Sequence, residues 1–117
     1  KLGVSPESIE LSPDGRWLAA VMMNGSNLAP TDPLLTDHGQ VVLFERVGAT
    51  FRHRQTVNVG RIPEGAAFTP DGRHLVVQTH PDRRLWVFDV GRSGLRDTGL
   101  RIPVPGMPSG MRAQGGR

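Results

Sequence analysis

Two stretches of the chain share one pattern of apolar and polar positions. "LSPDGRWLAA" at 11–20 and "FTPDGRHLVV" at 68–77 each place a Pro-Asp-Gly turn between two short β-prone runs. Pro presets the second position of a type I turn, and Gly accepts the left-handed conformation that closes a hairpin. Each stretch therefore predicts two antiparallel strands, and their recurrence after 57 positions indicates two copies of one structural unit.

Each copy continues with two further apolar or alternating runs, so that four strands are expected per unit. For the first copy the expected strands are 7–12, 17–23, 40–46 and 51–60. For the second copy they are 65–69, 74–79, 84–90 and 95–103.

The two copies differ in their second connection, and a third unit begins after them. The first copy has a long insert at 24–39, where the second has only "HPDR" at 80–83. "GMPSGMRA" at 106–113 aligns with "RIPEGAAF" at 61–68 and predicts the first strand of another unit. We therefore divide the chain into 1–62, 63–105 and a closing strand with a C-terminal tail at 106–117.

The polarity of the strands indicates how these units pack. The second strand of the first copy is apolar on both faces, formed by Trp17, Ala19 and Val21 and by Leu18, Ala20 and Met22. The fourth strand has a wetter face, with Arg52, Arg54, Thr56 and Asn58, as expected of an outer edge. A sheet buried on both faces must lie between other layers. We predict an all-β fold of four-stranded antiparallel β-propeller blades, two and the first strand of a third, with Trp17 and Trp86 largely buried.

Composition narrows the function classes. The 15 Gly and 10 Pro suit short strands and tight turns, and no apolar run approaches the roughly 20 residues that span a bilayer, so no membrane partner is expected. The net charge of +3 comes from Arg scattered along the chain, which does not predict nucleic-acid binding. The absence of Cys excludes disulfides and thiolate metal ligands and leaves the compartment open. We expect a soluble protein of the bacterial cytoplasm or periplasm.

The second copy resembles a known family. "PEGAAFTPDGRHLVV" followed by "LWVFDV" is similar to the blade signature of the lactonase-like, YVTN-type seven-bladed propellers, which include 6-phosphogluconolactonase-like and carboxymuconate-cyclase-like proteins. The resemblance covers both units. It implies a hydrolase or cyclase acting on a sugar-derived or dicarboxylate lactone in a central channel. The same signature occurs in propellers that only bind, so a scaffold for a protein or small ligand is the alternative.

The resemblance also implies that more blades are needed. Propellers close with about four to eight blades, and two blades leave apolar faces in water. We expect this chain to be the C-terminal portion of a larger propeller. Its expected partners are the remaining blades, or further copies of the chain, together with a small lactone ligand.

The candidate site residues are grouped where the innermost strand of each unit begins. Glu7 and Glu64 each follow a Pro at that point, which in a propeller lies near the channel mouth. With the resemblance, Glu64 is the expected general base, His80 the proton shuttle and Arg61 the anion holder. The alternative is structural: Glu64 pairs with an Arg such as Arg61, and His80 is an ordinary polar turn residue.

Three further residues are expected to bind ligand. The carboxylates of the two Pro-Asp-Gly turns are expected to have a structural role. Glu7, and Asp32 and His38 from the insert, are the predicted ligand contacts, because long loops on rigid scaffolds often set specificity. Asp14 and Asp71 stand in the Pro-Asp-Gly turns and are predicted to bond the local backbone. No metal-binding or cofactor motif occurs in the sequence, so no metal and no cofactor is predicted.

Overall fold

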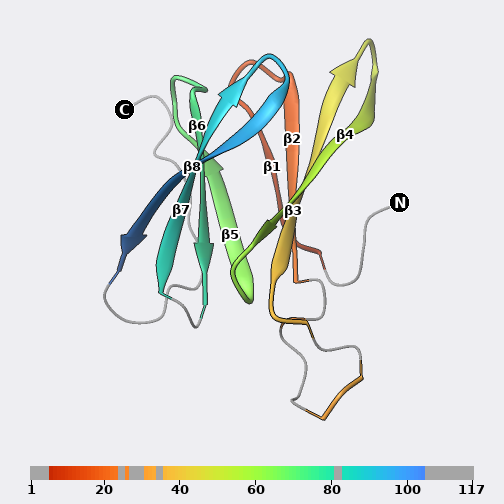
Figure 1. Ribbon diagram of the computed structural model, residues 1–117. Helices are drawn as coiled ribbons and strands as arrows, with labels where there is room; N and C mark the ends of the chain where they lie inside the picture. Colours follow the sequence, from red (N-terminus) through yellow and green to blue (C-terminus); the bar gives the residue numbers. More distant parts are fainter. Residues whose placement is uncertain (1–5, 24–25, 27–30, 34–35, 81–82, 105–117) are drawn as a thin grey trace.

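The computed structural model describes residues 6–23, 26, 31–33, 36–80 and 83–104. They form two four-stranded antiparallel sheets that lie side by side (Figure 1). The first sheet has the order β1 (Pro6–Leu11), β2 (Trp17–Met22), β3 (Gly39–Val47) and β4 (Thr50–Val59). The second has the order β5 (Pro63–Phe68), β6 (His74–Thr79), β7 (Arg84–Gly91) and β8 (Gly94–Pro103).

This arrangement confirms the predicted all-β fold, with strand ends within two residues of those expected. Strands β1 and β2 contact β5, so the first strand of each sheet lies at the junction of the two sheets. The predicted strand at 106–113 lies outside the described residues, and the division into 1–62, 63–105 and 106–117 stays a prediction. Within the described residues no helix is long and apolar enough to cross a membrane.

The first Pro-Asp-Gly turn closes as the sequence predicts. The Gly15 N–H donates to the Ser12 carbonyl at 2.9 Å, and Gly15 has a φ of 73°, in the left-handed region. The Asp14 carboxylate accepts hydrogen bonds from the Ser12 hydroxyl at 2.7 Å and from the Arg16 N–H at 3.0 Å. Its Oδ1 is therefore used inside the turn.

The second turn repeats these contacts with Thr69 in place of Ser12. The Gly72 N–H donates to the Thr69 carbonyl at 2.8 Å, and Gly72 also has a φ of 73°. The Asp71 carboxylate accepts from the Thr69 hydroxyl at 2.6 Å and from the Arg73 N–H at 2.9 Å. In both turns the hydroxyl bond is the main cause that lowers the pKa of the carboxyl. Both carboxylates have the structural role predicted for them.

The core lies in the seam between the two sheets. The first sheet contributes Trp17, Ala19, Val21, Val41, Leu43 and Val59, and the second contributes Ala66, Phe68, Leu75, Val77, Phe88 and Leu95. At one end of the seam Arg16 forms a salt bridge with Glu45 at 3.0 Å and donates to the Arg92 carbonyl of the second sheet at 2.9 Å. Apolar packing and this hydrogen bond both contribute to the contact between the two sheets.

The two tryptophans differ in burial. Trp17 is buried in the seam, as predicted. Trp86 in β7 is less buried than Trp17 but packs against the core, which agrees with the prediction that it is largely buried. The Arg101 guanidinium lies 3.5 Å from the centre of its ring, in a cation–π contact that covers part of the ring at the surface.

The outer face of the first sheet exposes apolar residues whose equivalents in the second sheet are buried. Ile9 and Leu11 in β1 are 52% and 54% exposed. Ile9 pairs with Ala20 and Leu11 with Leu18, just as Ala66 pairs with Val77 and Phe68 with Leu75. Yet Ala66 is 0% and Phe68 4% exposed, because the first sheet covers them. The corresponding cover over Ile9 and Leu11 is missing among the described residues.

Candidate functional site at the start of β5

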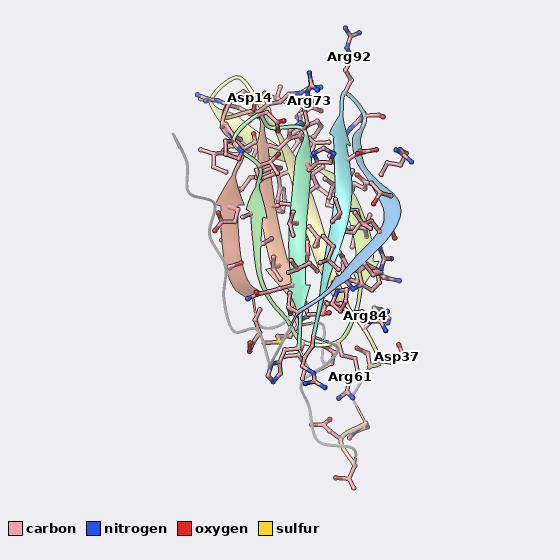
Figure 2. The ribbon with its side chains drawn as sticks, turned by 90° about the vertical axis from the view of Figure 1, so that its left-hand side faces the viewer. Asp14, Asp37, Arg61, Arg73, Arg84 and Arg92 are labelled. Carbon is pink, nitrogen blue, oxygen red and sulfur yellow. The ribbon has the colours of Figure 1, made fainter. Side chains whose placement is uncertain are left out.

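The predicted site residues of the second sheet lie at the end of the molecule opposite the Pro-Asp-Gly turns. Figure 2 shows Arg61, Arg84 and Asp37 at one end, and Asp14 and Arg73 at the other. Because β5 and β6 are antiparallel, the start of β5 and the end of β6 meet at the Arg61 end. The topology thus brings residues from 61–64 close to His80.

Glu64 is the extra residue of a β-bulge. Pro63 pairs with Thr79 and Gly65 with Gln78, so that Glu64 has no partner of its own in β6. The same irregularity occurs in β1, where the register shifts between Pro6 and Ser8 around Glu7. Bulges redirect a side chain and are common beside functional sites. Their recurrence at both predicted glutamates was not foreseen from the sequence.

Glu64 and His80 face each other at a distance too long for a hydrogen bond. Glu64 Oε1 lies 4.0 Å from His80 Nδ1, and the two side chains are 23% and 30% exposed. Glu64 Oε1 itself is buried and has no hydrogen-bond partner among the described residues. A buried carboxylate oxygen without a partner is unusual in a purely structural ion pair. In ligand-free enzymes, contacts of catalytic acids and bases are often this loose.

Arg61 is held by the main chain of neighbouring segments. Its Nη2 donates to the Ser26 carbonyl at 3.2 Å, and its own carbonyl accepts from the His80 N–H at 3.2 Å. Its Nε is buried without a hydrogen-bond partner among the described residues. We call Arg61, Glu64 and His80 together the Glu64 site.

The insert adds an aspartate–histidine contact whose carboxyl is influenced by Arg61. His38 Nδ1 lies 2.9 Å from Asp37 Oδ1, and this contact, followed by the charges of His38 and Arg61, lowers the pKa of the Asp37 carboxyl. The predicted ligand contact His38 therefore lies in the same electrostatic neighbourhood as Arg61. Asp32 is half-buried in the insert, and its predicted ligand contact stays a prediction. The side chain of Glu7 lies outside the described residues.

Two residues that were not predicted as site residues, Ile62 and Ser26, determine the conformation of the chain at residues 61–64, which we call the corner. Ile62 has a φ of 48°, in the left-handed region that a β-branched residue rarely adopts and that costs about 1–3 kcal/mol. Its N–H donates to the hydroxyl of Ser26 at 2.8 Å. Nothing in the sequence signals this conformation, since a residue before Pro is ordinarily expected to be extended. Within the described residues, no group of three or more His, Asp or Glu is arranged to hold a metal ion.

The fold defines the class of protein: two adjacent four-stranded blades of a β-propeller, with the Glu64 site at one end of the second blade. No protein-family model matches the chain, and no curated protein matches it. Solved structures do. The chain is 28% identical to a hydrazine synthase of Kuenenia stuttgartiensis, with a TM-score of 0.66 over 92% of this chain and 26% of that one.

Two other structures add to this likeness. A protein of Bacteroides fragilis described as a putative 6-phosphogluconolactonase is 25% identical, with a TM-score of 0.65 over 83% of this chain and 25% of that one. The β-propeller domain of Cps50 (Swd1) from Myceliophteria thermophila is 12% identical, with a TM-score of 0.62 over 94% and 32% of the two chains. The last shows the fold alone. The chain spans a third or less of these structures, which support a propeller with lactonase-like neighbours.

Proposed function

We propose that the chain forms part of a lactonase-like, YVTN-type seven-bladed propeller that opens or closes a sugar-derived or dicarboxylate lactone at the Glu64 site. The observation that carries the proposal is the buried Glu64 Oε1, which has no hydrogen-bond partner among the described residues and lies 4.0 Å from His80 Nδ1. The likeness to a protein described as a putative 6-phosphogluconolactonase supports the lactone as substrate class.

The chemistry assigns one role to each residue of the site. Glu64 takes a proton from water, whose oxygen forms a bond to the lactone carbonyl carbon. The bond from that carbon to the ring oxygen then breaks, and His80 carries the proton to the leaving alkoxide. Arg61 binds an anionic group of the substrate with a guanidinium donor. Ring closure is the same sequence in reverse, and no cofactor is required.

The test is lactone hydrolysis by the full-length protein, followed as acid release at constant pH. Glu64→Gln keeps the shape of the side chain and removes its basicity, so we expect the rate to fall about 100-fold or more. Glu10→Gln, on the corresponding strand of the first sheet, is the matched control and should keep the wild-type rate. A Glu64→Gln variant that hydrolyses lactones as fast as wild type contradicts the proposal.

A non-catalytic scaffold that binds a protein or small ligand is the second candidate. It is favoured by the hydrogen bond that Arg61 Nη2 already donates to the Ser26 carbonyl, at 3.2 Å. In a scaffold, Arg61 would hold the main chain of the insert in place and would not bind a substrate. An inactive wild-type protein in which Glu64→Gln leaves ligand binding unchanged would support this alternative.

We also propose that further propeller blades cover the outer faces of the two described ones. This is supported by Ile9 and Leu11, which are half-exposed at positions where Ala66 and Phe68 are buried by a neighbouring sheet. Phe51, which pairs with Arg46 as the buried Leu95 pairs with Val90, is exposed as well. The alternative occupants are further copies of this chain. Apolar patches of this kind ordinarily drive association.

A further inference from the structure

We propose that Ser26 is the positioning residue of the Glu64 site, although it belongs to the insert that follows the first sheet's second strand. The inference that it acts in catalysis rests on the proposed function above. The inference that it sets the geometry of the corner around residues 61–64 rests on the structure alone.

Every polar group of Ser26 is engaged in this corner. The residue is fully buried. Its hydroxyl donates to the Met23 carbonyl at 2.7 Å and accepts from the Ile62 N–H at 2.8 Å. Its N–H donates to the Met23 carbonyl at 3.0 Å, and its carbonyl accepts from Arg61 Nη2 at 3.2 Å. Ser26 therefore links the end of β2 to the two residues that lead into β5.

The Ser26 hydroxyl accepts its hydrogen bond from Ile62, whose backbone conformation is unfavourable without support. Ile62 is in the left-handed region, a conformation that persists only where its surroundings hold it. Its N–H is held by Ser26, and its carbonyl accepts from the His80 N–H at 3.0 Å. Its successor Pro63 packs against Gly39, where an added Cβ would lie 2.3 Å from the Pro63 ring. A release of Ile62 would therefore move His80 on one side and Glu64 on the other.

A consequence is that the insert of one blade controls the site of the next. The second sheet, with only "HPDR" at 80–83 in place of an insert, offers no equivalent of Ser26 in sequence. Ser26 thus gives the insert a role in addition to the predicted ligand contacts: it fixes the corner from which Arg61 and Glu64 project.

Amide hydrogen exchange of the full-length protein tests the positioning directly. In Ser26→Ala we expect the amides of Ile62 and His80 to exchange about tenfold faster, since one hydrogen bond is lost and its neighbour loosened. Exchange in the hairpin 69–74 should stay at the wild-type rate. Ser26→Cys keeps a weak donor and acceptor and should lie between wild type and alanine. The exposed Ser93→Ala is the matched control and should change neither region.

A second variant covers the case in which Ser26→Ala does not fold. Ile62→Gly accepts a positive φ without strain, so the double variant with Ser26→Ala should fold and regain most of the protection at His80. Unchanged exchange at Ile62 and His80 in Ser26→Ala, an equal increase in hairpin 69–74, or a double variant that stays unfolded would each overturn the proposal.

Activity separates this proposal from the proposed function. If wild type hydrolyses lactones, Ser26→Ala should lower kcat and raise KM, because Glu64 and the anion-binding Arg61 are displaced together, and Ser26→Cys should recover part of both losses. If wild type is inactive, the lactonase proposal fails while the exchange measurement still decides the role of Ser26. An active Ser26→Ala enzyme with wild-type kcat overturns the positioning role.

Discussion

Gln55 in β4 holds the main chain of Leu95 in β8 through both polar atoms of its side chain. Gln55 Nε2 donates to the Leu95 carbonyl at 2.9 Å, and Gln55 Oε1 accepts from the Leu95 N–H at 2.8 Å. Gly94 makes this approach feasible, because a Cβ there would lie 2.4 Å from Gln55 Oε1. The outer strands of the two blades are thus joined by two hydrogen bonds between Gln55 and Leu95, in addition to the apolar packing of the seam.

Replacement of Gln55 tests the strength of this contact. Gln55→Glu keeps the acceptor for the Leu95 N–H but places a second oxygen against the Leu95 carbonyl. We expect a loss of about 1–3 kcal/mol in the free energy of unfolding, measured by denaturant titration. Gln40→Ala is the control, since the Gln40 side chain makes a long hydrogen bond of 3.4 Å to Asn58 at an exposed position. Equal effects of the two substitutions would show that the contact with Leu95 does not stabilise the seam.

The second turn gives a test of backbone conformation without steric conflict. Gly72 has a φ of 73°, and a Cβ added there would meet only the Pro13 ring, at 4.0 Å. Gly72→Val should therefore destabilise through conformation alone, by about 1 kcal/mol or more. Gly72→Asn should cost less, because Asn tolerates the left-handed region. A thermal melt in which valine and wild type coincide would contradict the assigned turn.

The local structure and most of the strand order in the sheets could be predicted from the sequence. The Pro-Asp-Gly signals at 13–15 and 70–72 predicted hairpins whose hydrogen bonds the structure contains, because turn chemistry is local. The difference in burial between Trp17 and Trp86 was not predicted. An apolar side chain indicates a place in a sheet, whereas its cover depends on which element lies beyond it, here the guanidinium of Arg101.

Less of the candidate site than of the fold could be predicted from the sequence. Glu64 and His80 were paired because strand topology brings the start of β5 to the end of β6. The bulge at Glu64 and the positive φ of Ile62 result from contacts with distant residues. Ser26 lies in an insert without a repeated counterpart, so no internal comparison of the two copies could reveal its role.

The shared turns also predict a pH effect. The Thr69 hydroxyl is the main cause that lowers the pKa of Asp71 from its usual 3.8. Stability from a lowered carboxyl pKa is present above 3.8 and is lost as the pH falls through the lowered value. Thr69→Val should raise the pKa of Asp71 toward 3.8 and so reduce the loss of stability in acid. Carboxyl carbon resonances followed by NMR give the titration.

Asp14 is the internal control for that titration, because its pKa is lowered mainly by Ser12 in the other turn. It should titrate identically in wild type and Thr69→Val. An Asp71 that titrates at the same pH in both proteins would show that the hydroxyl does not set its pKa.

The outer face can be tested by comparing equivalent residues. Phe68→Ala removes a side chain buried in the seam and should cost about 3–5 kcal/mol. Leu11→Ala, at the equivalent position on the uncovered face, should cost under about 1 kcal/mol in an isolated chain that a charged substitution at Ile9 keeps monomeric. In the full-length protein we expect the cost of Leu11→Ala to approach about 2–5 kcal/mol, because a further blade would bury it. A cost of Leu11→Ala that stays small in the full-length protein would show that no further blade buries this face.

Sedimentation velocity of the purified 12.7 kDa chain tests the central claim, that two blades need neighbours on their outer faces. We predict species larger than the monomer, either aggregates or closed rings of several copies, since Ile9, Leu11 and Phe51 are exposed together. Charged substitutions at Ile9 and Leu11 should shift the distribution toward monomer. A wild-type chain that sediments as a stable monomer and unfolds cooperatively would show that two blades suffice, and would contradict the claim.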